Sequence, residues 1–400
     1  MDRKSSSPHG GKLLVFLGLL AALTPLSTDM YLPGLPEMTE KLGVPASMAQ
    51  LTLTMTMIGM AAGQIAGGPL SDRLGRKPPL FFGMVVFAAA SAWCWLAEDV
   101  WHLLAARLVQ GAAGAFGIVI ARAIARDVTD GPQLTRYFAV LMMINGIAPI
   151  LAPVAGGQIL AFTDWRGVFF VLAGIGAAAA AAVLGYSETL PAGLRSRSFL
   201  ASFRNFPALL AQPYFRGHCL VQCFAFGAFF SYIAGSSYLF QNVYGLSPQA
   251  YSCIFGGIGV GLLCTGSLPA RFSGAVRESV MLKYAVTVPL AGSVLLLGGF
   301  LAGAPLWYTV PVLFVTITPL SVMSAASTAL ALSREGGSVS GSASALLGCA
   351  SMALGGVCMP LTGLAGDHTA VPMGCLMAAG YALAALAFFR CVAPFHRDEL

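Results

Sequence analysis

The sequence predicts an all-α membrane protein with twelve transmembrane helices. Hydrophobic residues make up 57% of the 400 positions and charged residues only 10%, which excludes a soluble protein of two or three domains. A helix needs roughly 20 apolar residues to cross a bilayer, and twelve stretches meet that requirement. The predicted spans are 13–33, 48–70, 79–97, 101–124, 138–161, 166–186, 216–240, 249–269, 280–302, 305–330, 341–364 and 371–392. The 47 glycines and 23 prolines fit this prediction, because membrane helices use them for close packing and kinks.

Basic residues predict the orientation of the spans. Almost all lysines and arginines fall in loops on the side of the N-terminus, and the opposite loops hold only Lys41 and Arg166. Because basic loops face the cytoplasm, both termini are expected there. The net charge of +6 therefore indicates topology, and no nucleic-acid partner is implied. The basic and then apolar N-terminus is similar to a signal peptide but lacks a small-residue cleavage site, so the first span is expected to be retained.

The longest polar interruption divides the spans into two groups of six. We expect a six-helix bundle at 1–186, a central cytoplasmic loop at 187–212 and a second six-helix bundle at 213–400. Such a division predicts a substrate site between the bundles near the middle of the membrane. The alternative is a single twelve-helix scaffold with an ordinary long loop.

Asp29 is the one carboxylate within an apolar span, in the stretch Leu26-Ser27-Thr28-Asp29-Met30-Tyr31-Leu32-Pro33. Acids inside membrane helices are costly and usually mark proton or ion pathways. We therefore expect Asp29 to exchange protons when its burial or its distance from a cation changes. The alternative is an acid at the helix end that faces external water, since Tyr31-Leu32-Pro33 ends the span.

The loop between the second and third spans contains a ten-residue motif, Gly68-Pro69-Leu70-Ser71-Asp72-Arg73-Leu74-Gly75-Arg76-Lys77. It resembles the cytoplasmic-loop motif of the major facilitator superfamily, G-x-L-x-D-R-x-G-R-(K/R), at every defined position. We expect a conformational switch in which Gly68 allows close helix packing and Gly75 a tight turn. Asp72 is expected to meet a helix N-terminus or an arginine of a neighbouring helix. The expected switch residues are Gly68, Asp72, Arg73, Gly75, Arg76 and Lys77. The alternative is a basic loop that only sets topology.

A second motif, Leu103-x-x-x-Arg107-x-x-Gln110-Gly111-Ala112-Ala113-Gly114, lies in the fourth span. It resembles the superfamily's span-4 motif, in which an arginine within the membrane serves proton coupling. A rise of ~1.5 Å per residue through a core ~30 Å thick puts Asp29 and Arg107 at similar depth. A structural arginine that bonds carbonyls of the first helix is the alternative, and the two roles are compatible.

The fifth span contains two prolines four residues apart. Its stretch Gly146-Ile147-Ala148-Pro149-Ile150-Leu151-Ala152-Pro153-Val154-Ala155-Gly156-Gly157 resembles the antiporter motif of the superfamily's drug exporters, with Ala152 in place of a glycine. Prolines release backbone carbonyls and bend a helix, and glycines allow tight contact with another span. The resemblance, which rests on Gly146, Pro149, Pro153, Gly156 and Gly157, implies export, because uptake members of the superfamily usually lack this pattern.

Together with Arg126-Asp127, Glu188-Thr189-Leu190-Pro191 and the stretch Ser340–Leu346, these motifs make the chain resemble the Bcr/CflA subfamily of drug:proton antiporters. The resemblance implies the major facilitator fold and a monomer among the lipids of a bacterial inner membrane. It also implies export of small amphipathic compounds, similar to bicyclomycin, chloramphenicol or florfenicol, in exchange for protons. The alternative is a proton-coupled metabolite transporter, for an amino acid, a nucleoside or a sugar-like solute, including a symporter.

The candidate substrate-binding residues are aromatic and amide side chains within the spans. They are Tyr31, Gln110, Asn145, Phe226, Phe229 and Tyr232. The five histidines, His218 among them, are expected in loops or at helix ends, and neither they nor the nine cysteines have metal-ligand spacing. No catalytic residue, metal or cofactor is therefore expected, and an enzyme is not predicted.

Overall fold

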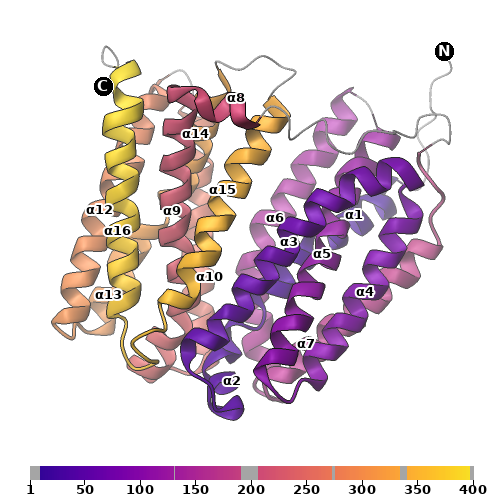
Figure 1. Cartoon of the computed structure of the whole chain (residues 1–400), viewed down its shortest axis with the longest axis horizontal. Coiled ribbons are helices and arrows are strands. Elements are labelled where there is room, and N and C mark those ends of the chain that lie inside the picture. The colour runs from indigo at the N-terminus through magenta and orange to yellow at the C-terminus, as the bar shows by residue number, and fades with distance from the viewer. Residues whose placement is uncertain (1–9, 130, 191–205, 273–274, 334–339, 397–400) are drawn as a thin grey trace. The chain divides into compact units, whose positions relative to one another are not determined.

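The computed structural model describes residues 10–129, 131–190, 206–272, 275–333 and 340–396, which form helices and connecting turns (Figure 1). Contacts divide the chain into two compact units. Unit 1 comprises Met1–Tyr31 and Met55–Phe199, and unit 2 comprises Leu32–Thr54 and Leu200–Leu400. The predicted all-α fold class is confirmed.

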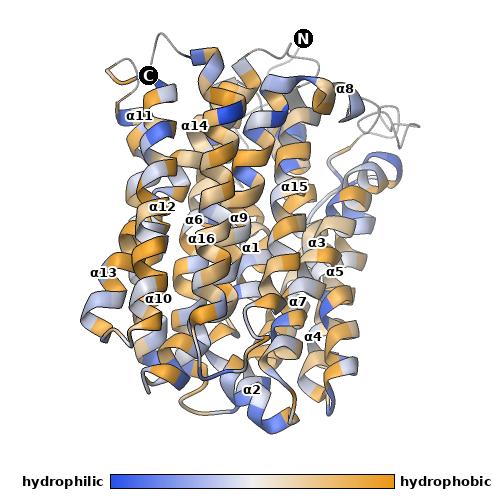
Figure 2. Cartoon of the chain, turned by 60° about the vertical axis from the view of Figure 1, so that its left-hand side comes forward, coloured by the Kyte–Doolittle hydropathy of each residue, from blue (hydrophilic) through white to orange (hydrophobic). Residues whose placement is uncertain are grey.

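Each predicted span coincides with a helix or with a pair of helices. Over the described ranges, ten helices are long and apolar enough to cross a membrane, and Leu346–Leu361 is a shorter apolar helix. The second predicted span forms the 29-residue helix α3 (Ala46–Leu74), which carries several threonines and glutamines and is not among those ten. Hydrophobic residues cover the long helices, and hydrophilic ones gather near helix ends and in α2 (Figure 2).

Unit 1 is built from six helices, with only the later part of α3 belonging to it. They are α1 (Gly10–Asp29), α3, α4 (Lys77–Leu96), α5 (Val100–Val128), α6 (Gly131–Ile159) and α7 (Trp165–Leu184). Helix α4 packs against α5 and α7, and α1 packs against α5 and α6. Asp99 and Asp164 accept hydrogen bonds from backbone N–H groups in the first turns of α5 and α7, which explains where these helices begin.

Glycines allow the backbones of α3 and α5 to lie in direct contact. A Cβ on Gly59 or Gly63 would overlap backbone atoms of α5, and a Cβ on Gly111 would overlap the backbone of Thr56 in α3. By contrast, a Cβ on Gly68 would lie 3.7 Å from Val119 Cγ1, which is ordinary contact. The close approach expected at Gly68 is therefore found nearer the middle of α3.

Unit 2 contains the remaining helices. They are the turn η1 (Leu32–Gly34), α2 (Leu35–Leu42), α8 (Phe206–Ala211), α9 (Pro213–Tyr238), η4 (Leu239–Val243), α10 (Pro248–Gly266), α11 (Leu268–Arg271), α12 (Glu278–Leu301), α13 (Leu306–Ile317), α14 (Leu320–Ser333), α15 (Ser340–Leu361), α16 (Val371–Ala387), η5 (Phe388–Val392) and η6 (Ala393–His396). Helix α9 packs against α14, α15 and α16. The tenth predicted span is two helices, α13 and α14, because Pro319 between them cannot donate a backbone hydrogen bond.

The segment Leu32–Thr54 is held in unit 2 by hydrogen bonds to α9 and α15. Ser237 Oγ donates to the Leu32 carbonyl (2.7 Å), and the hydroxyls of Thr39 and Tyr238 lie 2.6 Å apart. Further along, Thr54 Oγ1 donates to the Gly356 carbonyl (2.7 Å). Helix α3 therefore begins in one compact unit and ends in the other.

Candidate functional site

Asp29 is the last residue of α1, and its exposed fraction is only 8%. This burial argues against an acid that faces external water. The turn before it is tightened by side chains, since Ser27 Oγ donates to the Thr24 carbonyl (2.8 Å) and Thr28 Oγ1 to that of Pro25 (3.2 Å). These side-chain bonds share the carbonyls of the last turns of α1, and Pro25 lies inside the same helix. A buried carboxyl group is thus fixed at the end of a proline-containing helix.

Arg107 on α5 is fully buried beside the end of α1. Its Nη1 donates to the Ser27 carbonyl (2.8 Å) and to Gln110 Oε1 (2.5 Å). Its guanidinium group lies over the Tyr31 ring, 4.3 Å from the centroid, which adds a cation–π attraction. The alternative prediction for Arg107 was a structural arginine that bonds carbonyls of the first helix, and the bond to the Ser27 carbonyl is of this kind.

The guanidinium group retains unused donors. Arg107 Nε and Nη2 are buried and have no hydrogen-bond partner, and no ion pair joins them to Asp29 among the described residues. Leaving charged donors unsatisfied in a buried position is costly. The site therefore has capacity for one further acceptor next to Asp29.

Two of the predicted substrate-binding residues interact with Arg107. Tyr31 stacks on Arg107, and Gln110 accepts from it while its Nε2 donates to Ser91 Oγ (2.7 Å). Asn145 on α6 donates to the Leu141 carbonyl of its own helix (3.0 Å). In this structure all three side chains orient helices or neighbouring side chains.

The antiporter motif on α6 contacts the backbone next to Asp29. A Cβ on Gly156 would overlap the carbonyl oxygen of Met30, so only glycine fits there. Pro149 and Pro153 lie inside the same helix, with Pro153 and Gly157 buried and Gly146 half-buried. Since Gly156 sets how closely α6 approaches Met30, the motif fixes the position of the helix end that holds the acid.

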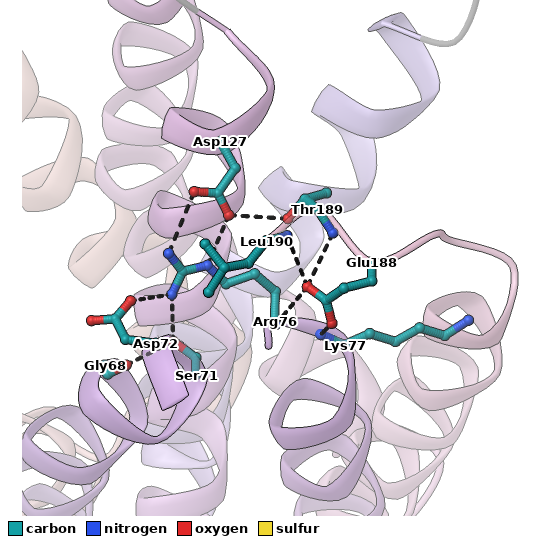
Figure 3. A network of polar contacts seen from close by, with 9 residues as sticks. All are labelled: Gly68, Ser71, Asp72, Arg76, Lys77, Asp127, Glu188, Thr189 and Leu190. Atoms are coloured by element: carbon teal, nitrogen blue, oxygen red, sulfur yellow. Dashed lines mark hydrogen bonds and ion pairs between the residues drawn. The ribbon is translucent and has the colours of Figure 1, made fainter. Parts of the chain in front are cut away.

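The switch motif between α3 and α4 forms a polar network around Arg76 (Figure 3). Arg76 Nε donates to Asp127 Oδ2 (2.8 Å), and Arg76 Nη1 donates to Asp72 and to Ser71 Oγ (2.9 Å). Asp72 therefore pairs with Arg76 of its own motif, at the start of α4, whereas a helix N-terminus or an arginine of a neighbouring helix was the expected partner. Gly75 has φ +98°, which confirms the predicted tight turn, and Arg73 is exposed.

The start of the central loop completes this network. Glu188 accepts from the backbone N–H groups of Arg76 (2.8 Å) and Lys77 (3.1 Å), so it caps α4 from 111 positions away in the chain. Thr189 Oγ1 donates to Asp127 Oδ2 (3.1 Å), and Lys77 Nζ donates to the Leu184 carbonyl (2.9 Å). Asp127, Glu188 and Thr189 belong to stretches on which the family resemblance rests, but no role was predicted for them.

The network shifts two pKa values in opposite directions. Burial disfavours the charge of Arg76, but hydrogen bonds to Asp127 and Asp72 outweigh it and raise the pKa of Arg76 above its usual value. Partial burial of Glu188 acts against its charge, yet backbone donors, with Leu190 foremost, hold the pKa of Glu188 below its usual value. Both groups are therefore charged at neutral pH.

Unit 2 brings the remaining substrate-binding candidates together in an aromatic cluster. The ring centroids of Phe226 and Phe229 lie 6.2 Å apart, and those of Phe229 and Tyr232 6.1 Å apart. Tyr232 also stacks on Phe255 of α10 at 5.6 Å, a neighbour that the sequence reading did not include. Phe226, Phe229 and Tyr232 all lie on α9, and Phe229 is the neighbour that the other two rings share.

His218 corrects one expectation about the histidines. It lies inside α9 and is fully buried, with Nδ1 3.1 Å from Ser327 Oγ of α14. The helix begins at Pro213, earlier than the predicted boundary, so a residue expected near the helix end lies within it.

Comparisons with known proteins agree with these features. The family model of the Major Facilitator Superfamily matches residues 17–360. An uncharacterised MFS-type transporter of Bacillus subtilis (strain 168) is 37% identical over 381 residues, which cover 94% of each chain. The bicyclomycin resistance protein homolog of Haemophilus influenzae is 31% identical, with 72% of this chain and 73% of that protein covered. The chloramphenicol resistance protein of Pseudomonas aeruginosa is 30% identical, with 68% and 65% covered.

Among solved structures, a bacterial homologue of the human lysosomal transporter Spinster superposes with a TM-score of 0.80. The match covers 99% of both chains at 16% identity, which supports the fold. The chain belongs to the major facilitator superfamily of membrane transporters, and within it is similar to bicyclomycin and chloramphenicol resistance proteins.

Proposed function

We propose that this transporter exports small amphipathic compounds from a bacterial cell in exchange for protons. The names of its resistance-protein relatives and the antiporter motif on α6 support export. In this proposal the chain crosses the inner membrane as a monomer with both termini in the cytoplasm. The bundles 1–186 and 213–400, joined by the loop 187–212, alternate between two orientations around a substrate site.

The observation that supports proton coupling best is that Asp29 is buried at the end of α1, where it feels the charge of an arginine that has unused donors. When Asp29 is ionised, its charge attracts the guanidinium group of Arg107, whose Nε and Nη2 have no hydrogen-bond partner. An ionised Asp29 can also accept a hydrogen bond from a donor group of a bound compound, and uptake of a proton by Asp29 weakens that bond. Proton and compound would then compete for the Asp29 carboxylate, as exchange requires.

The other motifs have supporting roles in this mechanism. Gly156 of the antiporter motif fixes the helix end that holds Asp29, because no side chain fits against Met30. The Arg76 network joins the α3–α4 loop to α5 and to the start of the central loop, so it stabilises one arrangement of these elements. The aromatic cluster of Phe226, Phe229 and Tyr232 offers apolar contact area for a compound.

The test compares wild type with Asp29→Asn, and Glu40→Gln serves as a control because it changes an exposed carboxylate in α2 in the same way. Tolerance to bicyclomycin, chloramphenicol and florfenicol is measured in a pump-deficient bacterium at matched protein levels. Proton release on addition of each compound is measured in everted membrane vesicles. We expect both signals for wild type and Glu40→Gln, and neither for Asp29→Asn.

Other outcomes separate the parts of the proposal. Full proton exchange by Asp29→Asn would falsify the role of Asp29. Protons that enter the vesicles on addition of a compound, instead of leaving them, would indicate symport and contradict export by exchange. Absence of any response by the wild type to this panel would contradict the proposed substrate class.

A further inference from the structure

Unit 2 has an apolar groove away from the residues described above. Its volume is about 430 Å³, and it is lined by residues of α10, α11, α12 and α14 and by Phe272, Val276 and Pro319. Apart from Thr265 and the hydroxyl of Tyr284, the lining side chains are apolar. Several of them are open to the surroundings, with exposed fractions of 44% for Phe272 and 63% for Tyr284. The groove therefore opens on the outer face of the helices that form it.

The length of the groove matches one leaflet of a bilayer. Its lining on α12 runs from Val280 to Val288, which corresponds to about 12 Å at ~1.5 Å per residue. The hydrocarbon of one leaflet is about 15 Å deep, half of a ~30 Å core. The groove starts where α11 ends and α12 begins, and thus at the level where a helix leaves the membrane. An extended acyl chain entering from that end would fit alongside α12.

Two basic residues lie next in the sequence to residues that line this end of the groove. The stretch 268–288 contains Arg271, Arg277 and Lys283 but only one acid, Glu278. Arg271 directly precedes Phe272 in the chain and Arg277 directly follows Val276, and both of these neighbours line the groove. Tyr284 adds an apolar ring with a polar tip, as is common at membrane interfaces. Clusters of this kind attract anionic lipid headgroups.

We propose that this groove binds an acyl chain of an anionic glycerophospholipid, with the phosphate of its headgroup against Arg271 and Arg277. The apolar lining would contact the acyl chain of the lipid. The excess of basic over acidic residues favours an anionic headgroup over a zwitterionic one. This inference is independent of the transported compound and of the direction of transport.

The experiment uses full-length protein in phosphatidylcholine nanodiscs that contain phosphatidylglycerol with a photoreactive diazirine in one acyl chain. Mass spectrometry locates the labelled peptides after irradiation. We expect labelling within residues 268–288, and weaker labelling by the same reagent with a phosphatidylcholine headgroup. Arg271→Gln and Arg277→Gln should each lower the apparent affinity about fivefold, since one cation near a membrane surface is worth ~1 kcal/mol.

Two substitutions fill the groove from different positions. Val288→Trp on α12 and Val276→Trp near the open end should both abolish labelling of this stretch. Val294→Trp is the matched control, because Val294 lies on α12 outside the groove with an exposed fraction of 57%. Arg390→Gln controls for loss of an exposed charge. Thermal unfolding checks that each variant is folded.

Three results would overturn the proposal. The first is equal labelling by the two headgroups. The second is unchanged labelling in folded groove-filling variants. The third is displacement of the label by a transported compound, which would assign the groove to substrate.

Discussion

Unit 1 contains two arginines that lie in very different settings. Arg76 uses all three nitrogens of its guanidinium group, with Nε and Nη2 bonded to Asp127 and Nη1 to Asp72 and Ser71. Arg107 uses only Nη1, and its other two nitrogens are buried without a hydrogen-bond partner. Saturated bonding suits a residue that fixes neighbouring elements, whereas spare donors suit a residue that exchanges partners. We therefore propose a structural role for Arg76 and a transport role for Arg107.

The largest expected effect comes from Arg107→Lys. Lysine keeps the charge but lacks the planar group that stacks on Tyr31 and presents several donors. Loss of one charge-assisted hydrogen bond costs about 1.5–3 kcal/mol, so compound-driven proton exchange in vesicles should fall at least about tenfold. Arg122→Lys, at an exposed position of the same helix, should have no effect. Normal exchange by Arg107→Lys would contradict the assignment of Arg107 to transport.

An intermediate effect is expected at the acids that hold Arg76. Asp127 has a side-chain exposed fraction of 14% and accepts two bonds from Arg76, whereas Asp72 is 47% exposed. Asp127→Asn should therefore lower the free energy of unfolding by about 2 kcal/mol, and Asp72→Asn by less than about 1 kcal/mol. Thermal unfolding of the two purified variants measures the difference. The reverse order would show that Asp72 is the main partner of Arg76.

The smallest expected effect concerns Glu188 and depends on pH. The pKa of Glu188 is below its usual value of 4.5 because backbone donors stabilise the carboxylate. Its contribution to stability is therefore complete above about pH 4.5 and is lost as the pH falls through the lower, folded-state pKa. Because the group is largely solvated, this contribution should not exceed about 1 kcal/mol. Melting temperatures measured from neutral to acidic pH should show this loss in wild type but not in Glu188→Gln.

The sequence predicted those features that depend on local pattern. Apolar length located the spans, and the motif predicted the tight turn that Gly75 makes with its positive φ. The partner of Asp72 was not predicted, because charge pairing depends on which residues the fold brings together. For the same reason the role of Glu188 as a cap of α4 was not predicted, because its partner Lys77 lies 111 positions earlier in the chain. Close helix packing was predicted at Gly68, but the structure shows it at Gly59 and Gly63, which contact the backbone of α5.

The bonds from Arg76 and Lys77 to Glu188 have a consequence for biogenesis. During synthesis, the start of α4 emerges from the ribosome long before the carboxylate that caps it. The first backbone donors of this helix must therefore bind water or lipid headgroups until the sixth span has been made. A separately expressed N-terminal half would need to extend through Leu190 to include the cap and its supporting turn.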